Sequence, residues 1–311
     1  MVGIGDDAAV LQRPTSGDLL FCSDAMVEGI HFELSTIPIF DLGYKALASC
    51  LSDIAAMNGR ALSAVITLAL PQTVSPREFL MEFYRGVGAL AKKYAVDIVG
   101  GDLSSSRSGI FIDVALLGSV ENRKTRAGAL EGDLVAISGH PGLSAAGFAA
   151  LQKNLAGWSE AKRAHLRPEP RFDLLPALDR HPGLVTSMID VSDGLARELY
   201  HLSRASRIGF EIDARLLPVH AEAVGLAALL GKSTLDWAFS GGEDYELLVT
   251  VAPEHLLDLP LDFTVIGKAQ KPGKGIQVIH PSGSIQNLEE SGYDHFAEDT
   301  SLGSRLKSRP T

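Results

Sequence analysis

The stretch TSMIDVSDGL, residues 186–195, decides the fold class of this chain. Its apolar start predicts a buried strand over 186–189, and a helical pattern follows over 195–206. Asp190 and Asp193 lie in the turn between these two elements. A strand that delivers acids into a turn before a helix is typical of an α/β protein, in which ligands bind beyond the strand ends.

Acidic residues recur beside the other apolar runs that predict strands. We expect further strands over 19–23, 63–70, 96–99, 110–120, 134–138 and 246–251, and helices over 41–58 and 75–94. The acids placed next to these runs are Asp24, Asp102 and the pair Glu243 and Asp244, with Asp6 and Asp7 near the start of the chain. Asp53 projects from the 41–58 helix among mostly small neighbours. Folding could gather these carboxylates in one cleft.

Chain length predicts two domains, because 311 residues exceed the size at which one hydrophobic core stops growing. The segment 121–133 is charged and contains two glycines, which favours a junction there. We expect an N-terminal domain over 1–125 and a C-terminal domain over 126–311. The alternation of helices and strands predicts an α/β (α+β) class for both.

Charge and composition exclude several classes of protein. A net charge of −10 argues against binding to nucleic acid or to an anionic membrane, since neither polyanion is attracted. The sequence contains no run of about 18 uncharged apolar residues, so we expect no membrane span. Cys22 and Cys50 are too few for a disulfide framework or a four-cysteine zinc site. We therefore expect a cytoplasmic protein whose two thiols are small packed side chains.

The repeated acids have two interpretations. Aspartate and glycine are ordinary turn residues, so each motif taken alone is consistent with a simple turn. Carboxylates that converge in a partly dry cleft, however, repel one another unless cations lie between them. Magnesium binds through one or two carboxylates together with substrate phosphates. The set therefore indicates a site for metal and phosphate, with ordinary turns as the alternative.

Standard nucleotide and nucleophile signatures are missing. No complete Walker loop occurs around Lys232 or Lys268. The match of 3–8 to the dinucleotide fingerprint is a decoy, because its two carboxylates would face the pyrophosphate. Neither zinc spacing nor a nucleophile elbow is present, so we expect no dedicated catalytic side chain. His31 could contact a substrate or be a bystander, and Arg126 could clamp a phosphate or be solvated.

Taken together, the ordered motifs resemble the thiamine-monophosphate kinase family, within the aminoimidazole ribonucleotide synthetase superfamily. The matching motifs are GIGDDAA (3–9), SD (23–24), GIHF (29–32), YKALA (44–48), LSDIAAM (51–57), GGD (100–102), HLRP (165–168), DVSDGL (190–195), SGGEDYEL (240–247) and GYDHF (292–296). This resemblance implies two domains with mixed sheets flanked by helices, and a homodimer joined through the N-terminal domains. It also implies ATP-dependent phosphorylation of thiamine monophosphate to thiamine diphosphate.

The resemblance also implies roles for individual residues. Several magnesium ions would be bound by Asp7, Ser23, Asp24, Asp53, Asp102, Asp190 and Asp193. ATP would be held by Gly101, Asp102, Arg126 and Ser192, and thiamine monophosphate by His31, Glu243 and Tyr293. The metals would align donor and acceptor phosphates, and an anionic acceptor oxygen needs no base.

Two departures from the family pattern leave a second hypothesis open. Relatives carry some two dozen residues before the GIGDD motif, whereas Met1 almost abuts it here, and Cys22-Ser23 stands where serine and threonine are common. The alternative is a non-catalytic sensor of nucleotide and magnesium with the same fold. Selenophosphate-forming, hydrogenase-maturation and purine-pathway relatives are disfavoured, because their cysteine or Asp-Gly-Val-Gly motifs are missing.

Overall fold

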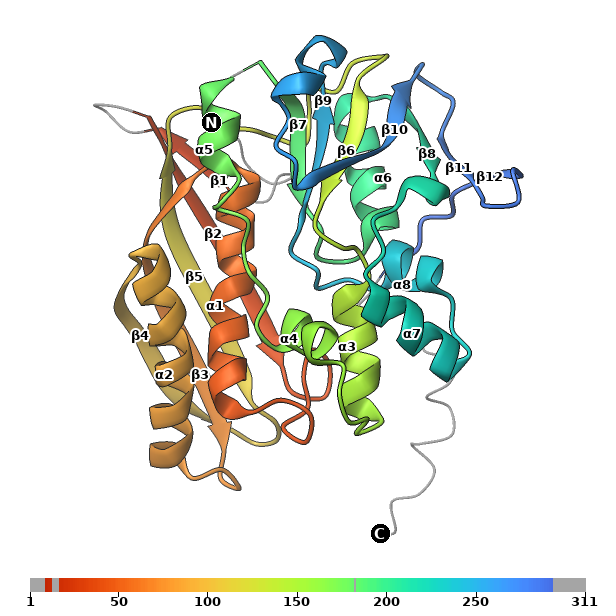
Figure 1. The fold of residues 1–311 in the computed structure, drawn as a ribbon. Helices are drawn as coiled ribbons and strands as arrows, with labels where there is room; N and C mark the ends of the chain where they lie inside the picture. Colours follow the sequence, from red (N-terminus) through yellow and green to blue (C-terminus); the bar gives the residue numbers. More distant parts are fainter. Residues whose placement is uncertain (1–8, 13–16, 182, 293–311) are drawn as a thin grey trace.

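The computed structural model describes residues 9–12, 17–181 and 183–292, which form two α/β halves built on separate sheets (Figure 1). The expected α/β class, with mixed sheets flanked by helices, is confirmed. The predicted boundary at 125/126 falls in the connection between the two sheets and stays a prediction. Within the described part of the chain, no helix is both long and apolar enough to cross a membrane.

The first sheet has five strands in the order β1-β2-β5-β3-β4. Its strands are β1 (Ala9–Gln12), β2 (Asp18–Val27), β3 (Arg60–Pro71), β4 (Asp97–Ser106) and β5 (Phe111–Val120). Only β3 and β4 pair in parallel; the other pairs are antiparallel. Helices α1 (Ile39–Ala56) and α2 (Pro76–Tyr94) lie on the same side of this sheet, and the opposite face carries no helix of the described chain (Figure 1).

Helix α2 is amphipathic in the way that its sequence predicts. Phe79, Phe83, Val87 and Leu90 recur at helical spacing and are all buried against the first core. Pro76 occupies the first turn, where its missing N–H costs nothing. Ser75 at the N-cap forms no side-chain capping bond. The apolar stripe therefore fixes this helix with little help from its N-cap.

Helix α1 lies between the two halves of the molecule, and almost every residue in it is buried. Leu47 and Leu51 face the first core, whereas Ala55 and Ala56 pack into a core shared with the second sheet. A Cβ on Gly43 would lie 2.1 Å from the Phe83 carbonyl oxygen, so glycine permits the close approach of α1 to α2. The helix begins at Ile39, two residues before its predicted start, and Asp41 in its first turn pairs with Arg167.

The second sheet has seven strands in the order β12-β11-β8-β10-β6-β9-β7. Its strands are β6 (Leu134–Ser138), β7 (Val185–Asp190), β8 (Gly209–Asp213), β9 (Leu247–Val251), β10 (Phe263–Gln270), β11 (Ile276–Ile279) and β12 (Ile285–Asn287). The helices of this half are α3 (Leu143–Gln152), α4 (Ser159–Leu166), α5 (Leu175–Arg180), α6 (Leu195–Ser206), α7 (Ala221–Leu230) and α8 (Thr234–Ser240). Leu199 and Leu202 of α6 pack into one core of this sheet, and Leu175 and Leu178 of α5 pack with β7 and β9 into another.

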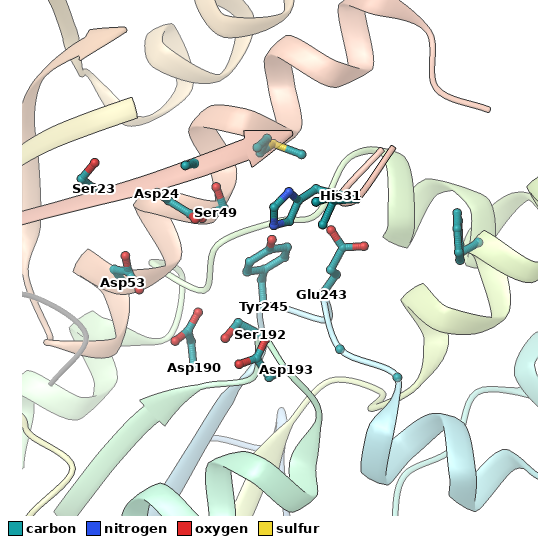
Figure 2. Close-up of a pocket in the computed structure, with 16 residues that line it drawn as sticks. Ser23, Asp24, His31, Ser49, Asp53, Asp190, Ser192, Asp193, Glu243 and Tyr245 are labelled. Carbon is teal, nitrogen blue, oxygen red and sulfur yellow. The ribbon is translucent and has the colours of Figure 1, made fainter. Parts of the chain in front are cut away.

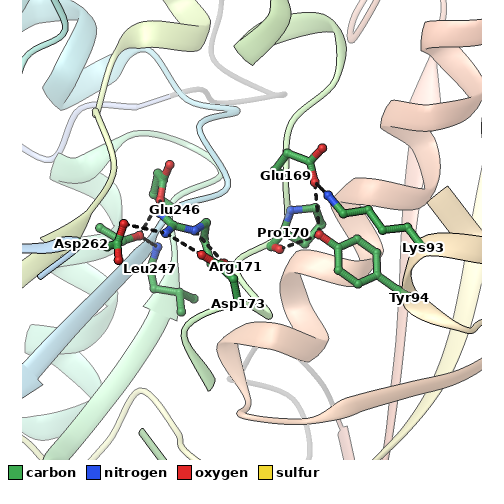
Figure 3. A network of polar contacts seen from close by, with 10 residues as sticks. Lys93, Tyr94, Glu169, Pro170, Arg171, Asp173, Glu246, Leu247 and Asp262 are labelled. Carbon is green, nitrogen blue, oxygen red and sulfur yellow. Dashed lines mark hydrogen bonds and ion pairs between the residues drawn. The ribbon is translucent and has the colours of Figure 1, made fainter. Parts of the chain in front are cut away.

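A polar network joins α2 to the second half (Figure 3). Lys93 forms an ion pair with Glu169, which also accepts a hydrogen bond from the Tyr94 hydroxyl at 3.2 Å. Two residues further along the chain, Arg171 contacts Glu246 at 2.6 Å beside β9. Each of these acids faces a basic or hydroxyl donor, so the segment 169–171 fastens the two halves together.

The strands continue past some of the acids that were expected to follow them. Asp24 lies inside β2, because this strand pairs with β5 over its whole length. Asp102 likewise lies inside β4, opposite Thr67 of β3. Glu243 and Asp244 come just before β9, as the strand expected over 246–251 implies. Asp190 is the last residue of β7, so this strand too runs one residue past its expected end and includes an acid that was expected in the turn.

Candidate active site

Carboxylates from both halves line one cavity of about 440 Å³. Asp24 comes from β2, Asp53 from α1, Asp190 from the end of β7 and Asp193 from the turn before α6. Figure 2 shows Asp53 and Asp190 at one side of this cavity, with His31 and Glu243 at the other. Acids far apart in the sequence are therefore neighbours in space.

Hydrogen bonds hold several residues of the cavity, the first of them by a bond between the two halves. Asp190 accepts a hydrogen bond of 2.6 Å from the buried hydroxyl of Ser52 on α1. The Asp193 N–H donates to Glu198 in the first turn of α6 at 3.1 Å. His31 accepts at Nδ1 from the Val27 N–H at 2.9 Å, so a neutral ring carries its hydrogen on Nε2.

The electrostatics of the cavity reflect the crowding of its acids. Burial raises the pKa of Asp24, although a hydrogen bond from Ser49 and the nearby His31 partly oppose this. The pKa of the Tyr245 phenol is raised well above its ordinary value, first by burial and then by the charges of Glu243, Asp24, Asp190 and Asp53. Four carboxylates thus act on one buried hydroxyl. Such a cavity favours added cations.

The donor set suits magnesium. Asp24, Asp53, Asp190 and Asp193 offer carboxylate oxygens, the ligands that hard divalent cations prefer. A second group combines Asp53 with the thiols of Cys22 and Cys50, all within 4.8 Å of one another. Both thiols are buried, and the Cys50 thiol donates to the Val114 carbonyl at 2.9 Å. The Cys22 contact and burial raise the pKa of Cys50, so this thiol stays protonated and inert.

Comparison with known proteins identifies the family. Models described as AIR synthase related protein, N-terminal domain and C-terminal domain, match residues 5–120 and 131–279. Thiamine-monophosphate kinase of Escherichia coli (strain K12) is 40% identical, with 95% of this chain and 92% of the relative covered. The corresponding protein of Bacillus subtilis is 34% identical, with 95% and 93% covered. The chain belongs to the thiamine-monophosphate kinase family.

A solved structure of the same family has the same fold. AaThiL, complexed with AMPPCP and TMP, superposes with a TM-score of 0.85 at 33% identity, covering 94% of this chain and 92% of that one. The resemblance inferred from the ordered motifs is thus confirmed, and so is the two-part fold that it implied.

The cavity contains many of the residues that the thiamine-monophosphate kinase resemblance implied. Those lining it are Ser23, Asp24, His31, Asp53, Asp190, Ser192, Asp193 and Glu243. Asp7 and Tyr293 lie outside the described residues. The individual roles of all these residues stay predictions. Metal and substrate binding at one site would require the residues that line the cavity to lie close together, as they do.

Three of the implied residues do not line the cavity. Gly101 and Asp102 lie exposed on β4, at the edge of the first sheet. Thr125 accepts a backbone hydrogen bond of 2.9 Å from Met188, so the following Arg126 runs beside the middle of β7 and not at its Asp190 end. Their roles in binding ATP therefore also stay predictions.

Some residues at this kinase-family site were missed in the sequence. Ser49 and Tyr245 line the cavity, and Lys45 contacts Glu243 from behind. Helical spacing held a signal, since Lys45, Ser49 and Asp53 are four residues apart and share one face of α1. Hydroxyl and ammonium groups on the face of Asp53 could have been read as parts of the same site.

Proposed function

We propose that this protein transfers the terminal phosphate of ATP to thiamine monophosphate, forming thiamine diphosphate and ADP. The observation that carries the proposal is the cavity in which Asp24, Asp53, Asp190 and Asp193 converge from both halves. Family relatives are thiamine-monophosphate kinases, and AaThiL was solved with AMPPCP and TMP. Because ATP is the phosphate donor, we also propose a cytoplasmic location.

Magnesium is part of this proposal, held by the four aspartates with Ser23 and Asp7 assisting. When bound, the ions would supply positive charge that offsets the charge developing on the transferred phosphoryl group. The protein contributes position: its acids are held on two strands, a helix and a turn that meet only in the folded molecule. Positioning of donor and acceptor accounts for a large share of rate enhancement in such reactions.

The two sides of the cavity divide the substrates between them. Ser192 and Asp193 lie just before α6, whose N-terminal N–H groups favour phosphate. His31 and Glu243 lie on the side away from Asp53 and suit the heterocyclic part of thiamine monophosphate (Figure 2). An acceptor phosphate oxygen is already anionic near neutral pH, so no side chain has to remove a proton from it.

Purified protein incubated with ATP, magnesium and thiamine monophosphate is expected to form thiamine diphosphate and ADP in equal amounts. Chromatographic separation of the two thiamine phosphates measures this directly. Tight binding of nucleotide without any product, under conditions in which the Escherichia coli relative turns over, would instead support a non-catalytic nucleotide sensor.

We also propose a homodimer that forms through the open face of the first sheet. Phe21, Val65 and Phe111 project from the face opposite α1 and α2, with 45%, 39% and 38% of their surface exposed. Asp102 is on the same face, because strand register aligns it with Thr67 and, beyond that, with Asp113. A second copy would cover this apolar surface. Single exposed apolar residues are ordinary, but several on one face indicate an interface.

Phe111→Asp is expected to convert the dimer to monomer, because it places a charge in the apolar face. Light scattering coupled to gel filtration measures the mass. Met81→Asp is the matched control: Met81 is 59% exposed on α2, away from the open face, and the variant should stay dimeric. A wild-type mass of one chain would contradict the homodimer.

A further inference from the structure

Lys45 of α1 is a completely buried cation. Lysine is almost never fully buried unless its ammonium is paired, because an unpaired charge in a protein interior is costly. Its Nζ lies 2.8 Å from Oε1 of Glu243, whose own side chain remains 31% exposed in the wall of the cavity. A buried positive charge from the first half therefore stands directly behind a carboxylate of the second half.

His165 of α4 completes this cluster. Its Nε2 lies 3.4 Å from the Lys45 ammonium, and its ring stacks on Phe148 with centroids 5.0 Å apart. Burial, together with the charge of Lys45, lowers the pKa of His165 well below its usual value, so the ring is neutral. An ammonium only donates hydrogen bonds. Nε2 of His165 must therefore accept, and the ring hydrogen is on Nδ1.

Glu243 is held most firmly at one carboxylate oxygen, Oε1, by the Lys45 ammonium. Nδ1 of His165 lies 3.2 Å from the Ser144 hydroxyl and 3.5 Å from Glu243 Oε2, so the ring lies beside the other oxygen. Groups behind the cavity wall thus fix one end of the carboxylate, while the rest of the side chain stays open to the cavity.

The backbone at Glu243 is held in an unusual conformation as well. Its φ is +56°, in the left-handed region that side-chain-bearing residues rarely adopt, and it follows Gly242 at φ +70°. The Glu243 N–H donates to the Ser192 carbonyl at 2.6 Å, which ties this loop to the turn before α6. Such conformations persist where the surrounding structure overdetermines them and are common at functional sites.

We propose that Lys45 is a positioning residue for the thiamine end of the acceptor substrate. Acting through Glu243, it fixes a hydrogen-bond acceptor on the side of the cavity away from Asp53 and Asp190. That acceptor selects a monophosphate whose other end carries a cationic, amine-bearing heterocycle. The inference rests on the kinase function proposed above and adds to it the origin of substrate selection.

The position of Glu243 also depends on contact between the two halves. Lys45 belongs to α1, whereas Glu243 and His165 belong to the second half of the chain. The acceptor is therefore in place only when the halves are packed together around the cavity. Binding of thiamine monophosphate should be more sensitive to loss of Lys45 than binding of ATP, whose phosphates meet the aspartates on the other side.

The test is a double-mutant cycle with Lys45→Met and Glu243→Gln, in which KM is measured separately for each substrate. Each single variant is expected to raise KM for thiamine monophosphate about tenfold or more, the loss expected for one charged hydrogen bond. KM for ATP should change less than about twofold. If Lys45 acts through Glu243, KM for thiamine monophosphate in the double variant should be no higher than in the single variant with the higher KM.

Two further variants test whether the effect on KM depends on the charge of Lys45 and on its location beside the cavity. Lys45→Arg keeps the charge but not the shape, so it should recover part of the lost affinity for thiamine monophosphate. Lys93→Met is the matched control, because it removes another lysine that pairs between the halves, here with Glu169, which lies outside the cavity (Figure 3). Its KM values should equal those of the wild type.

Three results would overturn the inference. They are additive effects in the cycle, equal rises in KM for both substrates, and a lower melting temperature with unchanged KM. If Lys45→Met does not fold, the cycle is run with Lys45→Gln, which also removes the charge, and a KM for thiamine monophosphate equal to that of the wild type then contradicts the inference. A wild-type protein that makes no thiamine diphosphate contradicts the proposed kinase function itself, which is a separate outcome.

Discussion

The loop of residues 243–246 lies between two regions in which acidic side chains have different surroundings. Glu243 and Tyr245 face the cavity, whereas Asp244 and Glu246 line the cleft on the other side of the loop. In that cleft, Glu246 contacts Arg171 at 2.6 Å and Asp244 accepts from the N–H groups of Gly142 and Ser144. Every one of these acids has a donor supplied by the fold.

The cavity differs because its acids face one another. Among the described residues that line it, none is a lysine or arginine. Burial, and after it the charges of these carboxylates, raise the pKa of Tyr245. The comparison teaches that the acids of the cleft have their compensation built into the fold, whereas the crowded acids of the cavity favour added cations.

Asp53→Asn should produce the largest effect, because it removes a proposed metal ligand without disturbing the apolar contacts of α1. We expect thiamine diphosphate formation to fall about a thousandfold, with the melting temperature unchanged or raised. Asp173→Asn, which alters an exposed acid beside Arg171 in the cleft, is the control and should leave turnover unaltered. Near-normal turnover of Asp53→Asn would contradict the idea that the acids of the cavity, unlike those of the cleft, are needed for the reaction.

Arg171→Met should affect stability and not chemistry. Its side chain is 12% exposed and bonds Glu246 and Asp173, so its removal leaves Glu246 without its basic partner. We expect the free energy of unfolding in urea to fall by about 3 kcal/mol, while the folded variant keeps its KM values. A variant of normal stability that turns over slowly would show that the cleft takes part in the reaction.

Addition of magnesium with AMPPCP should stabilise the protein, since the pair binds the folded state only. At a concentration about a hundredfold above Kd, the gain is about 2.7 kcal/mol and appears as a higher melting temperature. Arg171→Met should show the full gain and Asp53→Asn much less. Equal stabilisation of both variants would mean that nucleotide binds without the acids of the cavity.

Among the expected changes in stability, that of Asp244→Asn in the cleft is the smallest. Burial raises the pKa of Asp244 from 3.8 to about 8, so the folded state holds a proton that the unfolded state releases. The stability contributed by this proton is present at low pH and is lost as pH rises through the folded-state value. Asparagine keeps the acceptor oxygen without the ionisation.

We therefore expect the wild type to lose about 1.4 kcal/mol of stability relative to Asp244→Asn between pH 7 and pH 9, the range around the folded-state pKa. Urea unfolding at several pH values measures the difference. Parallel pH profiles of the two proteins would contradict a buried, protonated Asp244. Asp213→Asn, at a half-buried acid paired with Arg215, provides a comparison in which no such gain is expected.

Elements with strong local periodicity could be predicted closely. The strand over 134–138 and the helix over 195–206 have the bounds that their sequence predicts, and the stripe of α2 is buried as its spacing requires. Strand ends near the acids were less predictable. β2 runs past Asp24 because its partner β5 offers hydrogen bonds for three further residues, and that partner lies some ninety positions away in the chain.

The order of the strands decided which acids share the cavity, and no local pattern contains that order. Asp24 and Asp102 both lie on strands of the first sheet, but β5 and β3 separate β2 from β4. Three strand spacings of about 4.8 Å each keep Asp102 away from the Asp24 side of the sheet. Asp53 and Asp190, which are far apart in sequence, are instead brought together because α1 packs against β7.

By itself, the amino-acid sequence determined the α/β class, the set of acids suited to metal and phosphate, and the family to which the chain belongs. These depend on residue type and short spacing, which are local properties. Only the tertiary structure decided that Lys45 stands behind Glu243 and that Asp244, its neighbour, faces away from the cavity. Such pairings arise from long-range packing, which brings side chains into contact without leaving a local pattern in the sequence.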